Sequence, residues 1–143
     1  MATTYYSTEI TRDDSRRYNE KGNYTLHGKF TLTAALVIND VIQMVRVSNG
    51  TRVLDIEIFS DDIDTNVATV IAFHVGDGSV TDRFASAITL GQSAGFLRGI
   101  QTKAGFCYQY TADDTIDLKV STAPATGATS GDIIMRVEVC NDV

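Results

Sequence analysis

Apolar and polar side chains alternate along several short stretches of the chain. Between residues 24 and 34, apolar side chains and one glycine occupy every second position, with Thr, His and Lys between them. A period of two is typical of a β-strand that buries one face. The same alternation recurs in further stretches, namely 41–47, 51–59, 67–75, 106–110, 116–121 and 133–139. The pattern therefore predicts seven or eight strands.

The parity of the apolar positions also predicts which side chains face the core. In 41–47 we expect Val41, Gln43, Val45 and Val47 to share one face. In 51–59 we expect Leu54, Ile56 and Ile58 on one face, with Asp55 and Glu57 on the other.

One stretch departs from strand periodicity. Phe84, Ala87, Ile88 and Gly91 follow the i, i+3, i+4, i+7 spacing that is typical of an amphipathic helix. This spacing predicts one short helix within 81–93, with a loop as the competing interpretation.

Turn residues separate the predicted strands at intervals of about 8–12 residues, which is typical of an antiparallel sandwich or barrel. Examples are Ser48-Asn49-Gly50, Gly76-Asp77-Gly78 and the loop 123–131, which holds the single proline. The fold class predicted from the residues is therefore all-β, with at most one short helix. A length of 143 residues fits one domain.

Charge divides the chain into two parts. The first 24 residues carry four basic and four acidic side chains, so the net charge of -6 belongs entirely to the remainder. We interpret 1–24 as an extended N-terminal arm and 25–143 as the β-sandwich domain. An acidic domain argues against nucleic acid as a partner, because phosphate binding depends on Lys and Arg. We also expect no membrane partner, since no long apolar segment is present, and synthesis in a cytoplasm, since no signal peptide is evident.

The motifs that suggest catalysis have simpler explanations. Residues 91–95, GQSAG, match the pattern around a nucleophilic serine, but that chemistry needs a histidine later in the chain, and His27 and His74 both precede Ser93. Cys107 and Cys140 form neither a CxxC motif nor a disulfide framework. We expect no enzyme activity, no small-molecule substrate, no cofactor and no metal.

A run of carboxylates leaves one alternative open. Asp61, Asp62 and Asp64 supply the oxygen ligands that calcium prefers. The run lacks the glycine and the final glutamate of an EF-hand loop, so solvated turn residues are the favoured interpretation. A small calcium- or carbohydrate-binding β-sandwich module remains an alternative function.

Three segments together resemble cement (decoration) proteins on the capsids of tailed bacteriophages. They are 53–65 (VLDIEIFSDDIDT), 75–84 (VGDGSVTDRF) and 105–117 (GFCYQYTADDTID), the last followed by 123–128 (APATGA). The resemblance covers roughly 50–140 and does not include the N-terminal arm. It implies a jelly-roll-like sandwich without catalysis that lies over junctions between major capsid protein subunits.

That resemblance also implies partners and a location. The expected partners are the major capsid protein and a second copy of the chain, with a homodimer favoured over a homotrimer, and the expected location is the outer surface of the virion. A tail, neck or fibre protein is the alternative within the virion. Tyrosine and arginine are enriched in protein interfaces, and the arm contains several of both. We therefore place the candidate interface residues in the arm. They are Tyr5, Tyr6, Arg12, Arg16, Arg17 and Tyr18.

Overall fold

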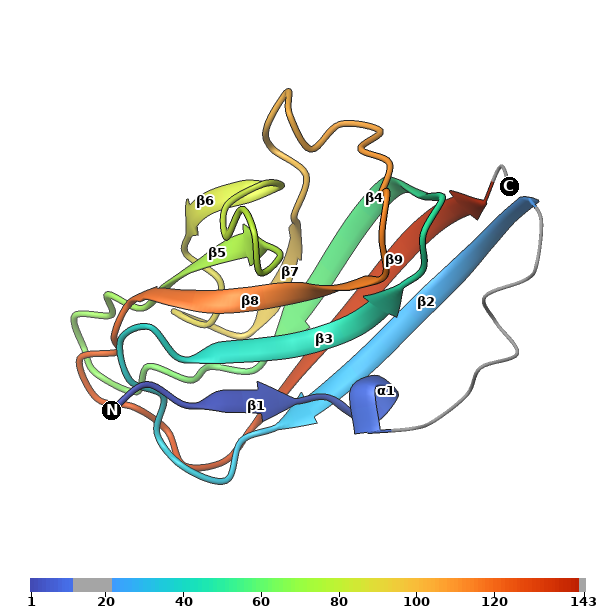
Figure 1. Cartoon of the computed structure of the whole chain (residues 1–143). Coiled ribbons are helices and arrows are strands. Elements are labelled where there is room, and N and C mark those ends of the chain that lie inside the picture. The colour runs from blue at the N-terminus through green and yellow to red at the C-terminus, as the bar shows by residue number, and fades with distance from the viewer. Residues whose placement is uncertain (12–21, 142–143) are drawn as a thin grey trace.

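A computed structural model describes residues 1–11 and 22–141 of the chain (Figure 1). These residues form nine strands and one helix of four residues. The elements are β1 (Thr4–Tyr6), α1 (Thr8–Thr11), β2 (Gly22–Thr31), β3 (Val41–Val47), β4 (Thr51–Ser60), β5 (Ala72–Gly76), β6 (Ala85–Ile88), β7 (Gly95–Arg98), β8 (Asp114–Thr122) and β9 (Asp132–Asn141).

The strands form two sheets that pack as a sandwich (Figure 1). Sheet A has the order β1-β3-β8-β5-β6, and sheet B has the order β2-β9-β4-β7. Neighbouring strands are antiparallel, except that β1 runs parallel to β3. From β2 onward every connection crosses between the sheets except the one from β5 to β6. The predicted class, an all-β antiparallel sandwich with at most one short helix, is confirmed.

The core lies between the two sheets and consists of aliphatic side chains with two fully buried phenylalanines. Phe73 and Phe84 are the largest of these side chains, and both are 0% exposed. Three predicted strands supply much of the core in the expected alternation, since 24–34, 116–121 and 133–139 correspond to β2, β8 and β9. Their buried side chains include Leu26, Phe30, Ile116, Leu118, Val120, Ile133, Met135, Val137 and Val139.

Two predicted strands form where expected but bury a different set of side chains. In β3 the pairing with β8 shifts between Gln43 and Val45, and Ile42 and Met44 are buried while Gln43 is not. In β4 the pairing with β9 shifts between Val53 and Asp55, so Val53 is buried and Leu54 is only partly buried. A β-bulge inserts one extra residue and reverses the parity beyond it. The predicted faces were therefore wrong on one side of each bulge.

The helix predicted within 81–93 is wrong, because Ala85–Ile88 forms strand β6. Phe73 pairs with Ile88 and Val75 pairs with Ala85, so the one residue between the pairs on β5 faces two residues on β6. Ala87 has a φ of 52° inside this irregularity. Of the residues that suggested a helix, Phe84 and Ile88 are both buried four positions apart, whereas Ala87 is exposed at the irregularity.

Two further strand predictions need correction. The segment 67–75 is a strand only from Ala72, and the side chain of Val67 is fully exposed. The segment 106–110 is an irregular loop that forms one isolated β-bridge with β4, between Arg52 and Gln109, and backbone hydrogen bonds with Thr51 and Val53. Cys107 has a φ of 58°, which continuous strand backbone does not adopt.

The start of the predicted arm lies against the sandwich. Strand β1 forms one edge of sheet A, and α1 lies between that edge and β2 (Figure 1). The backbone N–H of Ser7 donates to the carbonyl of Gln43, and the side chain of Ile10 is 6% exposed. No helix in 1–11 or 22–141 is long and apolar enough to span a membrane.

Candidate interaction surfaces

The six predicted interface residues fall into two groups. Arg12, Arg16, Arg17 and Tyr18 lie outside the described residues. Tyr5 and Tyr6 are the last two residues of β1, where side chains alternate in direction. Tyr5 is partly buried and packs on Phe30 with 5.3 Å between ring centroids, whereas Tyr6 is 53% exposed. Of these two tyrosines, Tyr6 is the one that presents most of its ring to a partner.

A glycine in β2 permits the close approach of α1 and β3. A Cβ at Gly28 would lie 2.1 Å from the carbonyl oxygen of Met44 and 2.8 Å from Oγ of Ser7. The Ser7 hydroxyl donates to that same Met44 carbonyl, and Nη2 of Arg46 donates to the carbonyl of Ile10 at 2.8 Å. These contacts hold Ser7 and Ile10, and with them the segment around α1, against β2 and β3.

The solvent-facing side of sheet B carries an unusual row of apolar side chains. Phe59 of β4 pairs with Ile134 of β9 on one side and with Phe96 of β7 on the other. Phe96 is 73% exposed and Ile134 is 36% exposed, and the rings of Phe59 and Phe96 are 5.1 Å apart. We call Phe59, Phe96 and Ile134 the apolar row. Outer faces of antiparallel sheets are normally polar, so a continuous apolar row is a candidate contact surface.

Charged side chains surround the apolar row. Three ion pairs lie on the same face of sheet B, and each joins one basic to one acidic side chain. They are Arg136 with Glu57, Arg98 with Asp55, and Lys29 with Asp132. Surface pairs of this kind contribute only about 0–1 kcal/mol each to stability. Their significance is electrostatic, because together they are neutral on a chain whose net charge is -6.

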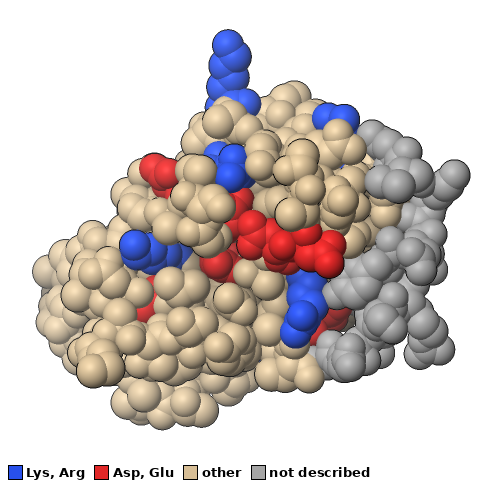
Figure 2. Space-filling view, viewed as in Figure 1, with Lys and Arg blue, Asp and Glu red and all other residues tan. Residues whose placement is uncertain are grey.

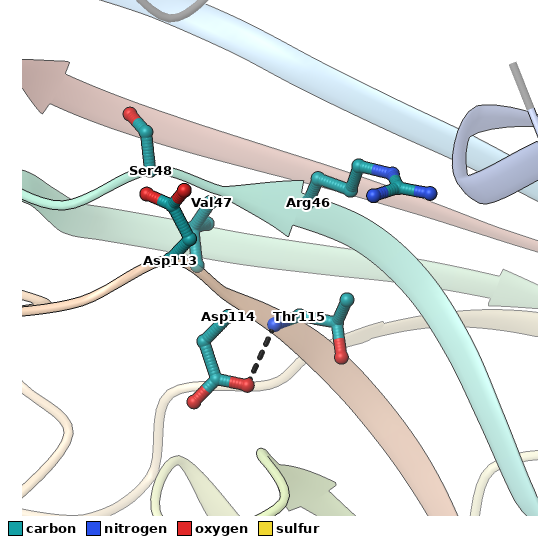
Figure 3. A pocket seen from close by; sticks show the side chains of 6 residues that line it. All are labelled: Arg46, Val47, Ser48, Asp113, Asp114 and Thr115. Carbon is teal, nitrogen blue, oxygen red and sulfur yellow. Dashed lines mark hydrogen bonds between the residues drawn. The ribbon is translucent and has the colours of Figure 1, made fainter. Parts of the chain in front are cut away.

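Acidic side chains gather on the opposite side of the molecule, on the face that carries β3 and β8 (Figure 2). A pocket of about 400 Å³ lies there between the end of β3 and the start of β8, lined by Arg46, Val47, Ser48, Asp113, Asp114 and Thr115 (Figure 3). Both aspartates already accept backbone hydrogen bonds, Asp113 from Asn49 and Asp114 from Thr115, each at 2.8 Å. The guanidinium of Arg46 points away from them, and it donates to the carbonyl of Ile10. The pocket therefore presents negative charge to solvent.

A buried aspartate lies on the same face, in the middle of sheet A. Asp117 of β8 is 7% exposed and accepts a hydrogen bond of 2.7 Å from the hydroxyl of Thr115. Burial raises the pKa of Asp117 to about 7, and the charges of Asp114 and Asp77 add to this effect, while the Thr115 hydroxyl opposes it. Asp117 lines a shallow pocket between β1 and the turn that follows β5. Its charge therefore changes near neutral pH.

A buried polar cluster fixes the irregular loop 106–110. Asp77 accepts from the guanidinium of Arg83 and, at 3.0 Å, from the hydroxyl of Tyr110. Burial raises the pKa of Asp77, but the bonds from Arg83, the Val80 amide and Tyr110 outweigh burial and hold that pKa below its ordinary value. The guanidinium also stacks over the Tyr108 ring at 3.9 Å. Every one of these groups is satisfied within the protein, so the cluster has a structural role.

The candidate calcium ligands are also engaged by the protein. Asp64 is 0% exposed, and its two carboxylate oxygens accept four backbone N–H groups. The donors are Val70, Ile71, Ala125 and Thr126, at 2.7 to 3.1 Å. A calcium ion at Asp64 would have to displace these bonds. Within 1–11 and 22–141, no group of three or more His, Cys, Asp or Glu side chains is arranged to hold a metal ion.

The residues of the serine motif are parts of turns and strands. Ser93 is an exposed residue of the turn between β6 and β7, and Gly91 has a φ of 87°, which favours glycine. A Cβ at Gly91 would lie 2.6 Å from the Ile63 side chain. His74 accepts a hydrogen bond from the Ala87 amide at 3.0 Å, and His27 is exposed on β2. The first glycine of the motif, Gly91, is thus explained by backbone geometry and packing.

Comparison with known proteins finds similarity at the level of structure. No family model and no curated protein sequence matches the chain. A chain from the capsid of Ralstonia phage GP4 superposes with a TM-score of 0.80 at 20% identity, covering 98% of this chain and 99% of that one. A chain from the cyanophage Pam1 capsid asymmetric unit gives 0.73 at 24% identity, covering 91% and 93%. A chain from the acid-stable capsid of Helicobacter pylori bacteriophage KHP30 gives 0.53 at 14% identity, covering 85% and 94%. At these identities the similarity establishes a shared fold, and all three chains come from phage capsids.

Proposed function

We propose that this chain is a cement protein of a tailed-phage capsid: a non-enzymatic jelly roll that binds the outer surface of the shell and bridges major capsid protein subunits. The observation that carries the proposal is the agreement of fold over nearly the whole length of both chains with a component of a phage capsid. The strand order supports the term jelly roll, because β2-β9-β4-β7 faces β3-β8-β5-β6 as in two interleaved Greek keys.

The surface of the molecule also supports a structural role. Two buried carboxylates, Asp64 and Asp77, bind to the protein itself. The exposed features are an apolar row, an acidic face and the exposed ring of Tyr6. Interface area, rather than a reactive pocket, is what a shell-stiffening protein needs. We propose that Tyr6 and the arm residues Arg12, Arg16, Arg17 and Tyr18 contact the shell, and that the protein acts as a homodimer.

The test compares matched capsids with and without the purified protein. Bound protein should raise the temperature or the force at which capsids rupture. Equal stability of complete shells in the two samples would contradict the cement role.

A tail, neck or fibre location is separated from a capsid location by imaging labelled protein on whole particles. Capsid decoration predicts evenly spaced copies over the head. Label confined to the tail or neck would overturn the proposed location while keeping the protein in the virion.

A further inference from the structure

We infer that the apolar row on sheet B is the surface through which two copies of this chain associate. This inference rests on the self-association included in the proposed function, and it adds the surface involved. The outward-facing positions of sheet B hold few apolar side chains. The outward residues of β9 from 132 to 138 are charged except Ile134, and the outward pair on β7 is Phe96 and Arg98.

The register of sheet B brings these isolated apolar residues together. Ile134, Phe59 and Phe96 lie in one cross-strand row, and Lys29 of β2 completes that row. The adjacent row consists of His27, Arg136, Glu57 and Arg98. Directly opposed side chains on one face of an antiparallel sheet lie about 4.5–5.5 Å apart at Cβ. The apolar side chains therefore form one contiguous strip that is bordered by charges.

Charge favours a second copy of this chain as the occupant. Two molecules with a net charge of -6 repel each other unless their contact surface is neutral or complementary. The three ion pairs that border the row, formed by Arg136, Arg98 and Lys29 with their acidic partners, carry no net charge. The additional outward carboxylate, Glu138, lies four residues from Ile134 along β9. In a two-fold dimer one patch meets itself, so a patch with equal numbers of both signs can pair each charge with its opposite. The acidic face of sheet A lacks this property.

The apolar row reaches one edge of sheet B. That edge is strand β7, which is four residues long and carries Phe96 on its outer side.

The area of sheet B limits the strength of the association. Strands about 4.8 Å apart with a rise of about 3.3 Å per residue give the outer face of sheet B a projected area of roughly 500 Å². This is near the lower limit for a specific interface, about 600 Å² per partner. The dimer should therefore dissociate on dilution.

Sedimentation equilibrium of the full chain over a concentration series, up to about 100 µM, tests the inference. Wild-type protein should reach the mass of a dimer, and Phe96→Lys should remain monomeric. Phe106→Lys is the matched control, because Phe106 is 70% exposed and lies in the irregular loop, which contacts β4 at Thr51–Val53, the end of that strand opposite to Phe59. That variant should dimerise as the wild type does. Circular dichroism checks that each variant is folded, and Phe96→Ser provides a second, smaller change at the same position.

Each outcome decides the inference. A monomeric wild type, or loss of the dimer in Phe106→Lys but not in the folded Phe96 variants, overturns it. A monomeric wild type whose capsid binding is abolished by Phe96→Lys would assign the row to a capsid subunit instead of a second copy. A Phe96-dependent dimer that fails to bind capsids would retain this inference and refute the proposed function.

Discussion

Two buried aspartates respond to pH in opposite directions. Burial raises the pKa of Asp64, but the four backbone N–H groups outweigh burial and bring that pKa well below its ordinary value. Asp64 therefore stabilises the fold above its ordinary pKa, and this contribution is lost as the pH falls. Asp117 has a raised pKa, so the folded state binds its proton more tightly than the unfolded state does. Its favourable contribution is present in acid and is lost as the pH rises through about 7.

The residue-scale prediction concerns Asp117→Asn. Asparagine is neutral at every pH and still offers an oxygen to the Thr115 hydroxyl, so the variant should avoid the cost of ionising Asp117 in the fold. At 1.36 kcal/mol per pKa unit, we expect the variant to be more stable than wild type at pH 8 by roughly 2–4 kcal/mol, and to lose this advantage near pH 4. Urea denaturation across this pH range measures the difference.

Asp113→Asn is the matched control, because Asp113 is exposed and lies four positions away on the same acidic face. It should leave the pH dependence of stability close to that of the wild type. A parallel pH profile for wild type and Asp117→Asn would show that Asp117 does not titrate near neutrality in the folded state.

At the scale of elements, strand β1 joins the start of the arm to the sandwich. Its three residues pair with β3 from Thr4–Val41 to Tyr6–Gln43, and the Val41 amide donates to the Thr3 carbonyl. Three residue pairs provide little stability by themselves, because ordering a residue costs about 1–2 kcal/mol. The packing of Tyr5 on Phe30 supplies the side-chain contact that holds β1 in place.

We therefore expect Tyr5→Ala to destabilise the fold by about 1–3 kcal/mol and to release β1. Chemical denaturation measures the loss, and hydrogen exchange at the Val41 amide reports the release. Tyr6→Ala is the control, because Tyr6 is mostly exposed and its removal should change stability by about 0.5 kcal/mol or less. Equal stability of the two variants would mean that β1 is held by its backbone pairing and not by Tyr5.

For the whole molecule, the distribution of charge determines which surfaces can meet an acidic partner. The body is acidic, whereas the arm is neutral overall and offers three arginines, Arg12, Arg16 and Arg17, to an acidic partner. If the arm binds an acidic shell, its affinity should fall as salt screens the charges, since the Debye length shortens from about 10 Å at 0.1 M to about 3 Å at 1 M.

Replacing all three arm arginines by alanine should weaken capsid binding and flatten its dependence on salt. A binding titration on capsids at two salt concentrations measures both effects, and thermal unfolding checks that the fold is unchanged. Lys103→Ala provides a control, because it removes an exposed positive charge that lies in neither the arm nor sheet B. Unchanged affinity and salt dependence in the triple variant would remove the arm arginines from the capsid contact.

Local chemistry made the sandwich predictable. Where apolar side chains alternate without interruption, as in β2, β8 and β9, burying one face of a strand is the only arrangement that removes them from water. Turn residues such as Asn49-Gly50 end strands through their own conformational freedom, and Gly50 indeed has a φ of 88°. Both properties belong to residues close together in sequence, so they can be read without knowing the fold.

The remaining features depend on pairing between distant strands. A bulge is defined by the pairing with the partner strand. The partial exposure of Leu54 therefore depends on how β4 pairs with β9, and the strand conformation of Ala85–Ile88 depends on its pairing with β5. Cys107 and its neighbours became a loop because Arg83 and Asp77 hold the nearby tyrosines. The apolar row has the same origin, since Phe59, Phe96 and Ile134 are single interruptions in three separate strands. The sequence by itself determined that these strands would form and bury a core, and only the register of sheet B, set by core packing across the sandwich, decided that the three residues share one surface.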